Sequence, residues 1–85
     1  MGSVPRPELP ESAWVTGQLV ILDGHRMQLT DFEEIQATIW IGLAERRMSV
    51  ADVARLIERS PTLVRDQAIK MGFRYDKSTK EYRIL

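Results

Sequence analysis

The sequence predicts a small α+β domain in which three helices lie between two β-hairpins. Apolar residues recur at helical spacing over 32–47 and again over 49–71, and a capping residue precedes each run. After Gly72 the spacing of the apolar residues changes to two, which is typical of strands. Short β-prone runs also flank Asp23-Gly24, a dipeptide that favours a hairpin turn. These observations place one hairpin before the helices and one after them.

Length and composition indicate one domain. The chain has 85 residues, four prolines and no cysteine, so neither a disulfide framework nor a thiolate metal site is available. We expect residues 1–13 to form an extended or disordered Pro-rich arm, with a docking peptide as the alternative, and residues 14–85 to form the domain. The sequence has neither an apolar run of about 18 residues nor a signal-peptide pattern, which predicts a soluble, cytoplasmic protein with no membrane partner.

Charge is divided unevenly along the chain although the net charge is zero. Residues 1–45 contain two Lys or Arg against seven acidic residues, whereas residues 46–85 contain ten against five. The basic half has the charge needed by a protein that contacts the phosphate backbone of nucleic acid. The alternative is a chance distribution of surface charge.

The first expected hairpin consists of strands over Gln18–Leu22 and Arg26–Thr30. Gly24 accepts the positive φ that the turn requires. A two-stranded hairpin is not stable by itself, so we expect it to pack on the helices or on a second copy of the chain. His25 is the only histidine and lies beside this turn, where we interpret it as a surface residue and not as a metal ligand or a base.

A longer helix is expected over 32–47, with Thr30 or Asp31 as its cap. Acidic residues in its first turn and Arg46-Arg47 in its last turn suit the helix dipole. The competing interpretation is a strand through Ala37–Leu43, where Ile-Trp-Ile is β-prone. Gly42 would permit close approach of a neighbouring element.

Apolar residues cover more than half of the circumference of this helix, which indicates that it is covered on two sides. We expect the second cover to be the first hairpin or another subunit. The predicted surface for a homodimer or a protein partner therefore lies in the N-terminal half and comprises Trp14, Trp40, Ile41 and Ala44.

Two shorter helices are expected over 49–71. Val50, Val53, Ala54 and Ile57 have the spacing of one buried helical face, and Ser49 precedes them as a cap. Ser60-Pro61 repeats the signal, because a proline is well placed at the first helical position. Only Glu58 and Arg59 remain for the turn, and two helices at that separation form a helix-turn-helix.

This segment resembles the helix-turn-helix of bacterial repressors and of their MerR-like and winged relatives. The resemblance rests on Asp52-Val53-Ala54, Ser60 and Val64. It implies a DNA-binding fold in which Ala54 is the small residue where the helices cross. The family usually has Gly and then an apolar residue in the turn, where this chain has Glu58 and Arg59. A left-handed residue at this point would be strained without Gly.

The second helix of the motif divides into two faces. Leu63, Val64, Gln67, Ala68 and Met71 are expected to point inward, and Thr62, Arg65, Asp66, Ile69 and Lys70 outward. The outward face matches a recognition helix in the major groove, where Arg65 can reach guanine and Ile69 can lie against a thymine methyl. Thr62 and Asp66 complete the predicted base-reading set. The alternative is an ordinary solvated helix face.

The second hairpin follows directly. Folding about residues 77–80 places Tyr75 opposite Tyr82 and Phe73 opposite Ile84, all on one face. A hairpin after the recognition helix is the wing of a winged helix-turn-helix, here residues 73–85. The alternative is a hairpin that only caps the core. The predicted phosphate contacts come from the helices and this wing: Arg55, Arg59, Lys70, Arg74, Lys77, Lys80 and Arg83.

The sequence has no nucleophile–base set, no metal-ligand spacing and no Gly-rich phosphate loop, so we expect no enzyme, no cofactor and no small-molecule substrate. The leading hypothesis is a sequence-specific binder of double-stranded DNA, a transcriptional regulator of bacterial, phage or plasmid origin that acts as a dimer. The alternative is a winged-helix protein-interaction module, which the carboxylates of Glu58, Asp66 and Glu81 favour. An antitoxin or an excisionase-like factor is a third interpretation that still binds DNA.

Overall fold

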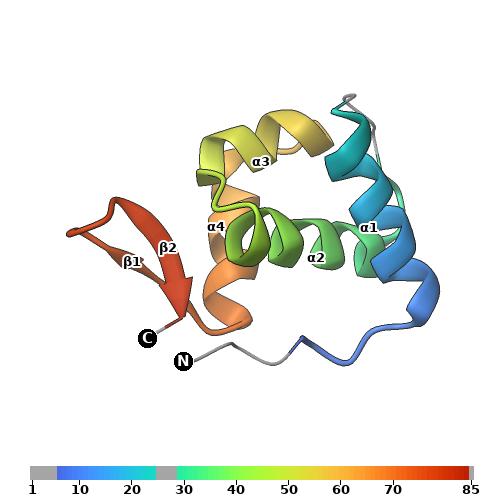
Figure 1. Ribbon diagram of the computed structural model, residues 1–85, viewed down its shortest axis with the longest axis horizontal. Helices are drawn as coiled ribbons and strands as arrows, with labels where there is room; N and C mark the ends of the chain where they lie inside the picture. Colours follow the sequence, from blue (N-terminus) through green and yellow to red (C-terminus); the bar gives the residue numbers. More distant parts are fainter. Residues whose placement is uncertain (1–5, 25–28, 85) are drawn as a thin grey trace.

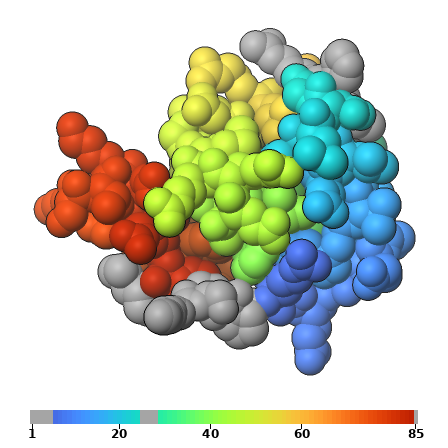
Figure 2. Space-filling model, in the orientation of Figure 1, coloured from blue at the N-terminus to red at the C-terminus, as the bar shows by residue number. Residues whose placement is uncertain are grey.

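The computed structural model describes residues 6–24 and 29–84. Its elements are, in chain order, α1 (Glu11–Asp23), α2 (Phe32–Trp40), the π-helix η1 (Ile41–Glu45), α3 (Val50–Ile57), α4 (Pro61–Lys70), β1 (Phe73–Asp76) and β2 (Glu81–Ile84). The four α-helices form one body, and the hairpin projects from the end opposite α1 (Figures 1 and 2). The α+β class and the C-terminal hairpin are therefore confirmed. None of the described helices has the length and apolar character needed to cross a membrane.

The predicted N-terminal hairpin is wrong, because Gln18–Leu22 lies inside helix α1. Gly24 does adopt a positive φ, of 67°, but it does so as the left-handed cap of α1, and its N–H donates to the carbonyl of Val20 at 3.3 Å. A left-handed Gly ends a helix as readily as it turns a hairpin. Of the second expected strand, residues 26–28 and the neighbouring His25 lie outside the described residues, and residues 29 and 30 are not in a strand. Helix α1 begins at Glu11, inside the segment 1–13 that was expected to be an arm.

Helices α1 and α2 pack closely and run antiparallel (Figure 1). The Trp14 ring of α1 contacts the Trp40 ring of α2. Three residues further along α1, Gly17 faces Thr38, which precedes Trp40 in α2, so the two helices run in opposite directions. A Cβ at Gly17 would lie 3.0 Å from the backbone nitrogen and from Oγ1 of Thr38, so glycine permits this approach. Val20 continues the same face of α1 and is fully buried.

The predicted helix over 32–47 is confirmed as α2, which runs directly into η1 and ends at Glu45. The alternative of a strand over Ala37–Leu43 is wrong. Asp31 caps α2 by accepting from the Glu33 N–H at 2.9 Å. Gly42, in η1, allows the close approach that the sequence indicated, because a Cβ there would lie 2.8 Å from Cγ2 of Val53 in α3.

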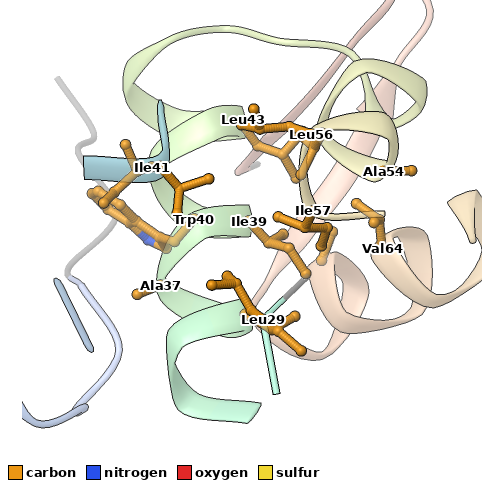
Figure 3. Packing of buried hydrophobic residues seen from close by; sticks show 14 of the residues in the cluster. Leu29, Ala37, Ile39, Trp40, Ile41, Leu43, Ala54, Leu56, Ile57 and Val64 are labelled. Carbon is orange, nitrogen blue, oxygen red and sulfur yellow. The ribbon is translucent and has the colours of Figure 1, made fainter. Parts of the chain in front are cut away.

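Helix α2 is covered from within the chain. It packs against α1 on one side and against α3 and α4 on the others. Figure 3 shows Leu29, Ile39 and Ile57 pointing toward one another, whereas Trp40 and Ala37 lie on the opposite side of α2. The apolar circumference of this helix therefore needs no second subunit.

The predicted dimer or partner surface is consequently wrong in three of its four residues. Trp14, Trp40 and Ile41 are only 8%, 7% and 2% exposed, and they belong to the hydrophobic core. Of the four residues, Ala44 alone is exposed. The two tryptophans and Ile41 are buried because α1 lies on α2, where a hairpin or a partner was expected.

Candidate nucleic-acid interface

Hydrogen bonds to the backbone define both ends of helix α3. The hydroxyl of Ser49 accepts from the N–H of Asp52 at 3.0 Å. At the other end, Glu58 adopts a left-handed conformation, with φ 56° and ψ 46°. Two backbone bonds close the turn: the Glu58 N–H donates to the Arg55 carbonyl at 3.3 Å, and the Arg59 N–H donates to the Ala54 carbonyl at 3.0 Å. Glu58 is therefore a strained non-glycine residue in the turn, at the position where the helix-turn-helix family that this segment resembles usually has Gly.

Helix α4 starts at Pro61, and the hydroxyl of Ser60 accepts from the N–H of Leu63 at 3.2 Å. The predicted division of its residues agrees with the structure. Val64 and Ala68 are fully buried and Gln67 is 8% exposed. After Pro61, the residues with exposed side chains are those expected to point outward: Thr62, Arg65, Asp66, Ile69 and Lys70.

The outward face of α4 combines charged, polar and apolar groups around a shallow hollow. Its lining includes Thr62, Asp66, Ile69 and Lys70. Ile69 is 41% exposed, and Nη2 of Arg65 lies 3.8 Å from Oδ1 of Asp66. This face can therefore offer hydrogen-bond donors, an acceptor and a methyl-bearing surface to the edges of base pairs.

The floor of this hollow is held by a contact between helices. Oε1 of Gln67 accepts from Nε2 of Gln36 in α2 at 3.4 Å. Gln67 is nearly buried, so its amide is held beneath the exposed residues of α4 and is not presented to solvent.

The predicted register of the second hairpin is confirmed, with Phe73 paired with Ile84 and Tyr75 with Tyr82. The side chain of Asp76 accepts from the Ser78 N–H at 2.9 Å, and its carbonyl accepts from the Lys80 N–H at 2.7 Å. These two bonds shape the turn, in which Lys80 has a φ of 59°.

The aromatic face of the hairpin is buried at one end only. Phe73 is 1% exposed, whereas Tyr75, nearer the turn, is 48% exposed. The Tyr75 and Tyr82 rings pack at 5.3 Å between centroids. Sequence reasoning treated Tyr75 as an inner residue and did not include this exposed aromatic ring in the candidate site, although its position next to the basic turn was the available signal.

The outer face of the hairpin is largely neutralised by its own groups. The cross-strand pairs are Arg74 with Arg83 and Asp76 with Glu81, so a pair of cations lies beside a pair of carboxylates on this face. Nη1 of Arg83 lies 3.6 Å from Oδ2 of Asp76. Nη1 of Arg74 donates to the carbonyls of Ile69 and Phe73, at 3.1 and 2.7 Å. These two arginines are therefore less available to phosphate than the sequence indicated.

The arginines of α3 and its turn have different environments. Arg55 is exposed and forms an ion pair with Asp52 on the same helix. Arg59 is partly buried, and its guanidinium donates to the backbone carbonyl of Leu29, thirty residues earlier. Arg59 thus holds the turn against the segment that precedes α2, a role that no pattern in the sequence indicates.

Three of the predicted phosphate contacts remain as exposed cations with neither a carboxylate nor a carbonyl partner in the described parts of the chain. They are Lys70 at the end of α4 and Lys77 and Lys80 in the hairpin turn. Within residues 6–24 and 29–84, no three His, Asp or Glu side chains are grouped closely enough to hold a metal ion. Comparison of the chain with protein-family models, with curated proteins and with solved structures gives no match.

Proposed function

We propose that this protein is a small sequence-specific DNA-binding protein of the winged helix-turn-helix type, and that it regulates transcription by occupying a promoter. The observation that carries the proposal is the outward face of α4, which presents side chains suited to base edges and is followed at once by a hairpin with lysines at its turn. A recognition helix in the major groove with a basic hairpin on the adjacent backbone uses both features together.

Base reading would fall to the exposed residues of α4. Arg65 can form a bidentate contact with O6 and N7 of guanine. Asp66, 3.8 Å from Arg65, would orient that guanidinium or accept from cytosine N4. Ile69 would contact a thymine methyl, and Thr62 a base or a phosphate at the start of the helix.

Affinity would come mainly from Lys70, Lys77 and Lys80, the exposed lysines that have no ionic partner in the described parts of the chain. The arginines at 55, 74 and 83 would contribute less, because each must exchange an internal partner for phosphate. Arg59 would act on the turn and not on DNA. The proposed DNA binding needs no dimer through Trp14, Trp40 and Ile41, because these residues are buried within one chain.

A protein-interaction module is the second candidate, and one observation favours it. Much of the positive charge near α4 and the hairpin is matched by Asp52, Asp66 and Asp76, which leaves a surface of mixed sign. Such a surface would bind a polar protein partner and would show no affinity for duplex DNA.

The two candidates separate in a fluorescence-anisotropy titration with a labelled mixed-sequence duplex at low salt. Arg65→Ala and the double variant Lys77→Ala/Lys80→Asn test the helix and the hairpin turn; Asn is chosen because it tolerates the left-handed conformation of Lys80. Arg46→Ala is the matched control, since it also removes an exposed cation from the basic half but lies on neither element. We expect wild type and the control to bind alike and both test variants to bind more weakly. Absence of binding by the folded wild-type protein would favour the protein-interaction module.

A further inference from the structure

Helix α1 has a second apolar face that nothing in the described chain covers. Val15, Leu19 and Leu22 are spaced i, i+4 and i+7, which aligns them on one side of the helix. They are 51%, 52% and 60% exposed. The buried residues of α1 lie on the opposite side, against α2: Ala13, Trp14, Gly17 and Val20.

A helix that is apolar all round is normally covered on both sides, and exposed apolar patches of this kind mark interaction surfaces. Helix α1 lies along one edge of the molecule, and the hairpin projects from the opposite edge (Figures 1 and 2). A partner on the outer side of α1 would therefore leave the hairpin turn accessible.

The charges around this face decide what can bind it. Helix α1 contains Glu11 near its start and Asp23 at its end, and it has no Lys, Arg or His. The antiparallel packing of α1 and α2 brings Asp31 and Glu33, at the start of α2, to the same end as Asp23. Across residues 7–24 and 29–45 the described chain has no basic side chain. Arg6, just before this range, lies over the buried Trp14 and Trp40 rings and pairs with Glu45. The apolar stripe thus has a carboxylate near each end and no basic side chain on its own helix.

A second copy of this chain would be a poor partner for such a surface. If the two α1 helices packed antiparallel, Glu11 of each would meet Asp23 of the other, and if they packed parallel, identical acids would meet. Like charges at close range oppose association and reject wrong partners. A helix with basic residues beside its apolar stripe would gain attraction at the same positions.

We propose that the outer face of α1 binds an amphipathic helix of another protein, one whose apolar stripe is flanked by Lys or Arg. Val15, Leu19 and Leu22 pack against that stripe, and Glu11 and Asp23 pair with the flanking cations. Side chains at this spacing form the ridge that packs between the ridges of a neighbouring helix. The site is separate from α4 and the hairpin, so it goes beyond the proposed DNA binding and does not depend on it.

The test uses two fluorescein-labelled synthetic helical peptides with the same pattern of leucines, one with lysine and one with glutamate at the flanking positions. Anisotropy titrations are made with the full chain, with Leu19→Gln/Leu22→Gln and with Glu11→Gln/Asp23→Asn. Ile69→Gln, which removes an exposed apolar side chain from α4, is the matched control. Circular dichroism confirms that each variant is folded.

We expect the lysine peptide to bind at least tenfold more tightly than the glutamate peptide. Leu19→Gln/Leu22→Gln should weaken the affinity for the lysine peptide at least tenfold, and Glu11→Gln/Asp23→Asn should also weaken it. Ile69→Gln should leave this affinity unchanged. Equal binding of the two peptides, or binding that survives Leu19→Gln/Leu22→Gln, would overturn the proposal. So would a dimer in sedimentation equilibrium that the leucine variant abolishes, because the occupant would then be a second copy.

Discussion

The indole rings of Trp14 and Trp40 meet edge to face, with their centroids 5.5 Å apart and their planes at 88°. Arg6 lies over both rings, with its guanidinium carbon 4.9 Å from the Trp14 centroid and 5.9 Å from that of Trp40. The same side chain reaches Glu45, with Nη2 3.4 Å from Oε1. One cluster therefore joins the segment before α1, α1 itself, the end of α2 and the end of η1.

The tryptophan pair should show measurable energetic coupling. In a double-mutant cycle of Trp14→Leu and Trp40→Leu, we expect a coupling of about 0.5–1.5 kcal/mol in the free energy of unfolding, the usual value for an edge-to-face aromatic pair. Urea unfolding followed by far-UV circular dichroism measures it without relying on tryptophan fluorescence. Strict additivity of the two single variants would contradict this account of the cluster.

Replacement of Glu58 by Gly should stabilise the protein. Glu58 has a φ of 56°, and the left-handed conformation costs a non-glycine residue about 1 kcal/mol or more. We expect Glu58→Gly to raise the free energy of unfolding by up to about 1 kcal/mol, whereas Arg55→Gly, inside α3, should lower it by a similar amount. Thermal unfolding of the two variants checks the opposite signs, and a loss of stability in both would show that the turn is not strained.

Addition of a methyl group at Gly42 should destabilise the junction of η1 and α3. A Cβ there would lie 2.8 Å from Cγ2 of Val53, a fully buried side chain with no freedom to move away. We expect Gly42→Ala to cost about 1–3 kcal/mol, the range for overpacked cores. Addition of Val53→Ala to this variant removes the clashing atom, so the double variant should lose less stability than the two single losses together.

Removal of the Arg59 side chain should lower the stability of the protein more than removal of the Arg55 side chain. Arg59 donates to the buried Leu29 carbonyl, and loss of a charged hydrogen bond of this kind costs about 1.5–3 kcal/mol. Arg55 forms an exposed ion pair, and such pairs contribute about 0–1 kcal/mol. Chemical unfolding of Arg59→Ala and Arg55→Ala checks the order, and equal losses would show that Arg59 has no special structural role.

The sequence was sufficient for the parts of the fold where a local signal has one structural meaning. Ser49 and Ser60 cap α3 and α4 as expected, because a hydroxyl before an apolar helical run has few other uses. The alternation after Gly72 predicted the pairing of Phe73 with Ile84, since the two aromatic rows fit together in one register only. The exposed face of α4 was predicted for the same kind of reason.

The signals that failed have two structural meanings. Gly24 with a positive φ fits a hairpin turn and a helix cap equally well, and the apolar run Leu19–Leu22 has no period that separates helix from strand. The outer stripe of α1 was missed for this reason. Trp14 and Trp40 were assigned to an outer surface because the sequence does not say which element covers α2. The partners of Arg59, Arg74 and Arg83 depend on tertiary contacts, so composition alone made the basic set look more available than it is.

The salt dependence of duplex binding tests the proposed DNA contact of α4 and the hairpin turn. It is measured as the slope of log K against log salt concentration. Each phosphate contact contributes about −0.9 to the slope for duplex DNA. We therefore expect a steep negative slope for the wild-type protein, which Lys77→Ala/Lys80→Asn should make less negative by about 2. Arg46→Ala should leave it unchanged. Binding that does not respond to salt, or a slope that is the same in wild type and the lysine variant, would contradict the claim that the hairpin turn grips the DNA backbone beside α4.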